Sequence, residues 1–489
     1  MATCTRTSTR RRMSQTVTVV LLGLATLGQA ETAAHSGGRP NILFIMADDH
    51  AAHAISAYGS KINKTPGIDR LAREGMRFTN CFNVDSLCAP SRAALITGRY
   101  NHHNGFRRNG DAFDGSQVTV QKLLQGAGYE TALIGKWHLK TQPTGFDFYG
   151  VGQSGYFNTP FRNTGDPWNK GNGVPVAGYL TDVITDKAIE WMDNRDKARP
   201  FFLMVHHKAP HTPHHYPKKY EELFADGPLP LPDNFNTAYE QRGAAMAKSR
   251  GRWSKLDHIT PAHFNKKVPK GLKPGTQAYK DWGYQCLFKG YLRLVAALDE
   301  NIDRLLEHLD ASGLAENTIV VYTSDNGFFL GDFGLFNKMW MYEESLRLPL
   351  IVRYPSEIKP GTVNDDIVSI LDCAPTFLDY AQTDAPAILQ GESIRPILTG
   401  NTPDDWRDAH YYHYYGQFDV PSHYGVRTAD HKLIHYYELP GESGWELYDL
   451  KEDPQENRNL YGQPGQAEVV QQMKSRLKEL RSRYEDADR

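Results

Sequence analysis

The segment Cys88-Ala89-Pro90-Ser91-Arg92 carries the most specific chemistry in this chain. A cysteine followed by proline two places on and arginine four places on is the signature at which a dedicated enzyme oxidises the cysteine to an aldehyde, formylglycine. The hydrated aldehyde has two hydroxyls on one carbon, so one can attack a substrate and the other can expel the transferred group. This would be covalent catalysis with a built-in exit route. The alternative is that Cys88 is a small buried apolar residue, the usual fate of a free cysteine.

Several apolar runs of the kind that form buried strands end in polar residues. Such runs favour central parallel strands, whose carboxyl ends meet at one edge of an open α/β sheet and form its site. A helix that starts near Cys88 would add amide dipoles that favour an anionic ligand. The runs and the residues that follow them are 41–46 with Asp48 and Asp49, 130–135 with Lys136, 201–206 with His211, and 318–323 with Asp325 and Asn326.

Further segments match a known family. The signature continues as Ala93-Ala94-Leu95-Ile96-Thr97-Gly98-Arg99, and the other matching segments are 41–50, 135–138 and 323–327. On these segments the chain resembles the type I sulfatases of the alkaline phosphatase superfamily, from Pro40 to about Leu460. The resemblance implies a sulfuric ester hydrolase with a formylglycine nucleophile made from Cys88. It also implies a maturation partner, either a formylglycine-generating enzyme or an anaerobic sulfatase-maturating enzyme.

The resemblance implies a metal site as well. Its ligands would be Asp48, Asp49, Asp325 and Asn326, with the modified Cys88 as a further ligand. Carboxylate and amide oxygens suit a hard cation. We therefore expect Ca²⁺, with Mg²⁺ as the alternative, to neutralise the sulfate oxygens.

Five further positions match catalytic residues of the family. Arg92 and Lys136 would hold the nucleophile and the sulfate, and His138 would be the base for breakdown of the intermediate. His211 and Lys338 would face the leaving oxygen, one of them protonating or stabilising it. Fixed cations of this kind suit the loose transition state expected by analogy with phosphoryl transfer.

The pattern of elements predicts an α/β fold with a large mixed, mostly parallel sheet flanked by helices, followed by a smaller antiparallel-sheet subdomain. We expect an export signal at residues 1–30, a catalytic domain at 38–386 and a C-terminal subdomain at 387–489. Residues 225–282 are rich in Pro, Lys, Asn and Gly and are interpreted as an insertion near the site mouth. A solvated surface excursion is the alternative for that segment.

Bulk properties fit an exported enzyme. The formal net charge is -2, and the mature chain has no recurring basic block that would indicate a nucleic-acid partner. Basic residues followed by a short apolar stretch and Gly28-Gln29-Ala30 resemble a cleavable signal, which predicts a periplasmic or extracellular location. A membrane anchor is the alternative, but the apolar run is too short to span a bilayer. Three cysteines besides Cys4 and Cys88 allow at most one disulfide.

The substrate is predicted only as a class. The tail resembles bacterial sulfatases that act on carbohydrates, such as N-acetylglucosamine-6-sulfatase-like enzymes, which predicts a sulfated carbohydrate substrate. Candidate contacts with it are His103, Tyr414, His423 and Arg427, with a packed strand surface as the alternative for the last three. Other functions left open are a formylglycine phosphonate monoester or phosphodiester hydrolase, and a catalytically silent protein that binds sulfated glycans.

Overall fold

The computed structural model describes residues 1–3, 5, 38–169, 171, 173–238, 242–248, 255–263 and 266–487. Residues Arg39–Arg489 form one compact unit. The export signal expected at residues 1–30 lies outside the described residues, apart from 1–3 and 5. Within the described part of the chain, no helix is both long and apolar enough to cross a membrane.

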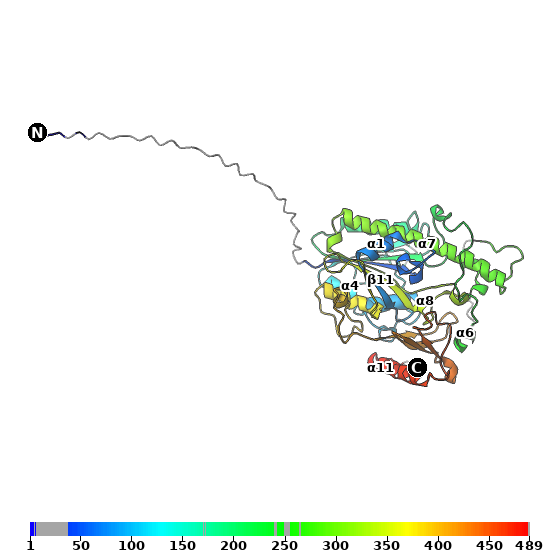
Figure 1. The fold of residues 1–489 in the computed structure, drawn as a ribbon. Helices are drawn as coiled ribbons and strands as arrows, with labels where there is room; N and C mark the ends of the chain where they lie inside the picture. Colours follow the sequence, from blue (N-terminus) through cyan, green and yellow to red (C-terminus); the bar gives the residue numbers. More distant parts are fainter. Residues whose placement is uncertain are drawn as a thin grey trace. The chain divides into compact units, whose positions relative to one another are not determined.

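A mixed sheet of 11 strands forms the centre of the fold, in the order β12-β2-β11-β8-β1-β7-β3-β4-β5-β6, with β13 also paired to β2 (Figure 1). The neighbours from β8 to β4 are parallel, whereas β11 is antiparallel to β8 and β2. This confirms the predicted fold class. The strands are β1 (Asn41–Asp48), β2 (Met76–Phe82), β3 (Glu130–Gly135), β4 (Phe148–Val151), β5 (Pro160–Asn163), β6 (Val174–Pro175), β7 (Phe201–Pro210), β8 (Thr318–Ser324), β11 (Arg347–Arg353), β12 (Thr362–Asn364) and β13 (Val368–Ser369). A two-stranded ribbon pairs β9 (Phe329–Leu330) with β10 (Phe336–Asn337).

Helices cover both faces of this sheet. α1 (Pro66–Glu74), α5 (Leu180–Asn194) and α7 (Gln277–Ala311) pack on one face, and α2 (Cys88–Thr97), α4 (Val120–Gly126) and α9 (Cys373–Tyr380) pack on the other (Figure 1). β1 contributes side chains to the hydrophobic cores on both faces of the sheet, because successive side chains of a strand alternate. Leu43 and Ile45 belong to one core, and Phe44 belongs to the other. The shorter helices are α3 (Asn101–Asn104), α6 (Ala244–Lys248), α8 (Glu343–Leu346) and α10 (Arg395–Leu398).

The amphipathic pattern of the sequence indicates a helix only at 292–309, whereas α7 already begins at Gln277. It begins after Thr276, whose hydroxyl accepts a hydrogen bond from the Tyr279 amide at 3.3 Å. The first half contains two glycines, which weaken the helical signal. Gly290 is required for packing, since a Cβ there would lie 2.8 Å from Cβ of His214. The last residues of the predicted insertion at 225–282 therefore belong to a core helix.

The C-terminal region forms a four-stranded antiparallel sheet, covered by α11 (Ala467–Arg483). Its strands are β14 (Ala409–Tyr414), β15 (His423–Thr428), β16 (His431–His435) and β17 (Trp445–Asp449). Lys432 on β16 is fully buried, with its ammonium 2.8 Å from the carboxylate of Glu343 and 2.7 Å from that of Glu456. Because Glu343 lies on α8, beside the main sheet, this ion network joins the two sheets.

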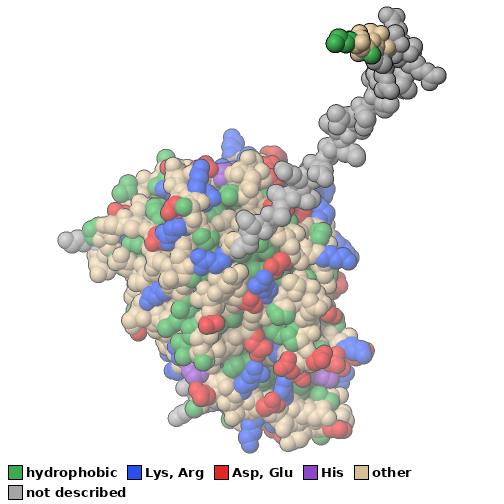
Figure 2. Space-filling model, turned by 90° about the vertical axis from the view of Figure 1, so that its left-hand side faces the viewer, with side chains coloured by type: hydrophobic (Ala, Val, Ile, Leu, Met, Phe, Trp, Pro, Cys, Tyr) green, Lys and Arg blue, Asp and Glu red, His purple; other side chains and the backbone are tan. Residues whose placement is uncertain are grey.

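The surface shows no single-sign field on the face in Figure 2, where Lys and Arg side chains are interspersed with Asp and Glu. This mixing agrees with a formal net charge of only -2.

Replacing Lys432 by methionine should strongly destabilise the protein. The change leaves two buried carboxylates without their ammonium, which costs about 3–5 kcal/mol of the free energy of unfolding. Urea denaturation followed by fluorescence measures this, with Lys359→Met at an exposed position as the control. A loss below about 1 kcal/mol for Lys432→Met would show that the network does not hold the sheets together.

Candidate active site

The predicted site residues meet where four neighbouring parallel strands end. Asp48 ends β1, Asp325 follows β8, and Lys136 follows β3. The register places Ala47 beside Ser324 and Asp48 beside Pro210, the last residue of β7. Parallel strands bring their carboxyl ends to the same edge, so distant segments of the chain deliver these side chains together.

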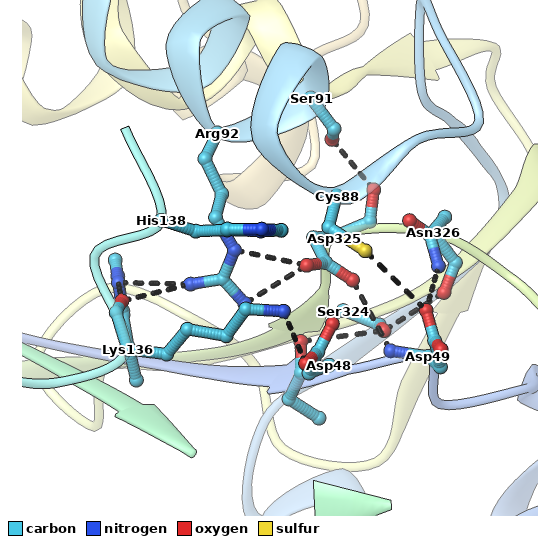
Figure 3. A network of polar contacts seen from close by, with 12 residues as sticks. Asp48, Asp49, Cys88, Ser91, Arg92, Lys136, His138, Ser324, Asp325 and Asn326 are labelled. Carbon is cyan, nitrogen blue, oxygen red and sulfur yellow. Dashed lines mark hydrogen bonds and ion pairs between the residues drawn. The ribbon is translucent and has the colours of Figure 1, made fainter. Parts of the chain in front are cut away.

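Cys88 is the first residue of α2 and points at this edge (Figure 3). It is 1% exposed, and its Sγ lies 3.9 Å from Oδ1 of Asp49. The helix begins at Cys88 itself, so the partial positive charge of the helix N-terminus falls on the site. Burial raises the pKa of the unmodified thiol to about 12, against the opposing charges of Lys136 and Lys338. An unmodified Cys88 would therefore stay protonated and be a poor nucleophile at neutral pH.

Three carboxylates form the acidic centre of the site. Oxygens of Asp48, Asp49 and Asp325 lie within 4.8 Å of one another. Burial and the neighbouring charge of Asp48 raise the pKa of Asp325 to about 7, even though Arg92 opposes this. Among the described residues, Oδ1 of Asp48 and Oδ1 of Asn326 are buried without a hydrogen-bond partner. Unpaired buried oxygens beside clustered carboxylates fit a hard divalent cation.

Each carboxylate also contacts one basic side chain. Arg92 donates to Oδ2 of Asp325 through Nε at 2.9 Å and lies 2.8 Å from it through a terminal nitrogen. The same guanidinium donates to the Lys136 carbonyl at 3.0 Å. The pairs Lys136–Asp48 and Lys338–Asp49 complete the set.

These pairs fix the charges of the site. Burial acts to raise the pKa of Asp48, but the charge of Lys136 and of further cations holds it well below its usual value. Burial acts to lower the pKa of Lys338, but Asp49 raises it above the ordinary value. Asp48 is therefore ionised and Lys338 protonated at neutral pH.

The two candidate histidines are neutral. Burial, with the charge of Lys136, lowers the pKa of His138 to about 2, and burial holds that of His211 well below 6.5. His211 Nδ1 lies 2.5 Å from the Thr212 carbonyl, which can only accept, so this nitrogen carries the proton. Nε2 of His211 is left as an acceptor, 3.7 Å from Oδ2 of Asp49. His138 lies beside the Arg92 guanidinium (Figure 3).

The four predicted substrate residues are not part of this cluster. Tyr414, His423 and Arg427 are buried in the C-terminal sheet, with exposures of 1%, 0% and 6%. His423 Nδ1 lies 2.8 Å from the Pro421 carbonyl, and Arg427 lies 3.4 Å from Glu343. His103 is partly exposed, with Nε2 2.8 Å from the Tyr484 carbonyl. The positions of Tyr414, His423 and Arg427 agree with the alternative of a packed strand surface.

Sequence reasoning missed two residues beside the site. The Tyr291 hydroxyl donates to the Asp49 carbonyl at 2.7 Å. Lys208 on β7 is 9% exposed, and burial, with the charge of Lys136, lowers its pKa to about 8. Lys208 could have been found from the sequence, because it is a lysine near the end of an otherwise apolar, histidine-containing strand. Tyr291 lies in a helical pattern that carries no such signal.

Comparisons with known proteins assign the family. The family model described as Sulfatase matches residues 40–383. The chain belongs to the sulfatase family. A second model, described as the C-terminal region of N-sulphoglucosamine sulphohydrolase, matches residues 331–483 of this sulfatase. Both the predicted resemblance and the prediction that the chain is an enzyme of this class are confirmed.

Similar proteins include an N-acetylglucosamine-6-O-sulfatase and a phosphonate monoester hydrolase. This sulfatase is 41% identical to an N-acetylglucosamine-6-O-sulfatase of Bacteroides thetaiotaomicron over 97% of this chain and 93% of that protein. It also matches the structure of a protein solved in complex with D-glucosamine-2-N,6-O-disulfate, the substrate of that protein. The TM-score is 0.87, the identity is 40%, and the match covers 92% of this chain and 99% of the other. A phosphonate monoester hydrolase of Agrobacterium radiobacter shares the fold, at a TM-score of 0.73, 22% identity, and 91% and 96% coverage.

Replacing Arg92 by lysine should destabilise the protein although the charge is kept. One ammonium cannot reproduce the fork that reaches both Asp325 and the Lys136 carbonyl, so we expect a loss of about 1–3 kcal/mol in the free energy of unfolding. Arg483→Lys, at the exposed pair with Glu392, is the matched control and should cost below about 0.5 kcal/mol. Equal losses in chemical denaturation would refute a special role for the buried fork.

Proposed function

We propose that this sulfatase removes the 6-O-sulfate of a glucosamine or N-acetylglucosamine unit, through a nucleophile formed at Cys88 and with the aid of a divalent cation. The observation that carries the proposal is the position of Cys88 at a helix N-terminus, facing three carboxylates and three basic side chains. The named substrate of the solved neighbour and the name of the Bacteroides relative support the sugar and the ester position.

The cation would be held by Asp48, Asp49, Asp325 and Asn326. The oxygens of the three carboxylates cluster, and Oδ1 of Asp48 and Oδ1 of Asn326 lack hydrogen-bond partners among the described residues. We expect Ca²⁺, with Mg²⁺ as the alternative, since oxygen ligands suit both. When bound, it would supply positive charge to the sulfate oxygens. The modified Cys88 would supply a hydroxyl nucleophile in place of the protonated thiol.

The chain's own cations would carry the electrostatic part of the reaction. Arg92 and Lys136 contact Asp325 and Asp48 of the acidic cluster, where they can bind nonbridging sulfate oxygens (Figure 3). Lys338 is protonated and contacts Asp49, so it can donate to the leaving oxygen. Preorganised charge of this kind stabilises a loose transition state without reorganisation at the moment of reaction.

The two histidines would act as neutral groups. His138 has a buried Nδ1 without a hydrogen-bond partner among the described residues, and its low pKa keeps that ring neutral, so it can accept a hydrogen bond from the nucleophile or the intermediate. His211 presents the acceptor nitrogen Nε2. A neutral acceptor cannot protonate a leaving group, which is why we assign that role to Lys338 rather than His211.

A cavity beside His138 offers room for the sugar. Its volume is about 260 Å³, and Trp137, Gln153, Arg162 and Trp168 are among the residues that line it. The Arg162 guanidinium lies 5.3 Å from the Trp168 ring. An aromatic face with a few polar groups is typical of ligand sites that orient a small molecule.

We also propose export and maturation for this enzyme. The basic and apolar composition of residues 1–30 supports delivery to the periplasm or the outside. The Cys88-Ala89-Pro90-Ser91-Arg92 signature supports a cysteine-oxidising partner enzyme. Expression with and without such an enzyme should separate active from inactive protein.

Sulfate release from 6-O-sulfated N-acetylglucosamine tests the function. The wild type, made with a maturation enzyme, should release sulfate, and Cys88→Ala should lower the rate by roughly 10³-fold or more because the nucleophile is lost. Cys373→Ala, at a buried cysteine in α9, is the matched control and should retain activity. Faster hydrolysis of an aryl phosphodiester than of any sulfate ester would favour the phosphodiesterase alternative instead.

Removal of the cation should abolish turnover. Enzyme treated with a chelator should regain activity on addition of Ca²⁺ or Mg²⁺, and calorimetric titration will show which ion binds more tightly. Asp48→Asn should weaken that binding by about tenfold or more, because one carboxylate charge is lost. Asp384→Asn, at an exposed position, should bind as the wild type does. Full activity in the chelated enzyme would contradict the metal assignment.

A further inference from the structure

A second cavity lies behind the loop that carries His211. Its volume is about 670 Å³, within the range of small-molecule sites. Residues of this loop, of the following segment and of α7 line it, among them His214, Lys218 and Lys289. It is distinct from the cavity beside His138, with which it shares no lining residue.

Positive charge dominates this cavity. Four basic side chains and one carboxylate, that of Glu221, line it. Within the described part of the chain, none of the four basic groups forms an ion pair with a carboxylate. The four are Lys218, Lys266, Lys289 and Arg293.

Hydrogen bonds hold the base of the cavity, whereas its rim is exposed to solvent. Arg293 is 6% exposed, and its guanidinium donates to the carbonyls of Leu223 and Glu221 at 3.0 and 2.6 Å and to the Tyr216 hydroxyl at 2.7 Å. These partners are neutral, so the buried charge is hydrogen-bonded but not neutralised. Lys218 and Lys266 are exposed. Like charges around one hollow create a positive potential that attracts an anion.

This cavity adjoins the site of ester cleavage. His211, next to Asp49, and His214, in the cavity wall, are three residues apart, a span of at most about 10 Å. Tyr291 connects the two sides: its hydroxyl donates to the Asp49 carbonyl, and its ring packs edge-on against His214 at 5.8 Å. A saccharide with one unit at Cys88 can therefore extend toward the basic cavity.

We propose that this cavity binds a second anionic group, a sulfate or a carboxylate, of the saccharide whose ester is cleaved at Cys88. The inference rests on the proposed function and narrows its substrate to saccharides with more than one negative charge. Arg293 and Lys289 would hold the anion at the base, and Lys218 and Lys266 would close on it from the rim.

The test compares charge reversal at the rim with the same change elsewhere. Lys218→Glu/Lys266→Glu is the variant, and Lys64→Glu/Lys359→Glu, at exposed lysines outside the cavity, alters the net charge equally. The ligands are 6-O-sulfated N-acetylglucosamine, a disaccharide that joins it to a uronic acid, and one that carries a second sulfate. Binding is measured by calorimetry and sulfate release by ion chromatography, with thermal melting as the check on folding.

The rim variant should bind one or both anionic disaccharides about tenfold more weakly, with the monosaccharide unchanged within twofold and the control variant like the wild type. Loss confined to one disaccharide identifies carboxylate or sulfate as the ligand. Equal affinity of rim variant and wild type for all ligands overturns the inference. Absence of sulfate release by the wild type overturns the proposed function, whereas the binding comparison still decides the inference.

Discussion

Compensation of buried charge is the constraint on which this site depends. Three carboxylates stand at the ends of parallel strands, away from water, and each contacts one basic side chain: Arg92 with Asp325, Lys136 with Asp48, and Lys338 with Asp49. Uncompensated, such charges would destabilise the fold by several kcal/mol each. The cations that compensate the buried carboxylates are also the ones that a sulfate ester can contact. The same charges therefore serve both the stability of the fold and the proposed catalysis.

The helix N-terminus at Cys88 fixes the position of the nucleophile relative to the acidic cluster. Ser91 Oγ donates to the Asp325 carbonyl at 2.5 Å, and Arg92 reaches the side chain of the same residue, so the first turn of α2 is tied to the end of β8. The nucleophile position is therefore set by the backbone of a helix and not by a loop. Under the proposals above, the cavities beside His138 and behind the loop of His211 would select the saccharide.

Much of the fold and of the strand-end cluster could be predicted from sequence, because both depend on local patterns. Apolar runs such as residues 41–46 mark buried strands, and the polar residues after them mark the edge where a site forms. The start of α7 could not be predicted, since Gly283 and Gly290 serve packing contacts that only the tertiary structure shows. Arg427 has the residue type of a sulfate contact, yet its partner is Glu343, which is distant in sequence. Whether a cation binds substrate or a buried carboxylate is a property of the assembled fold.

The mass of the peptide that contains Cys88 tests the central claim most directly. Protein made together with a formylglycine-generating enzyme should contain a peptide about 18 Da lighter than the thiol form, because the aldehyde replaces the thiol as the source of the nucleophile. The extent of that conversion should follow the rate of sulfate release across preparations. Sulfate release by protein whose Cys88 peptide keeps the full thiol mass would contradict the account.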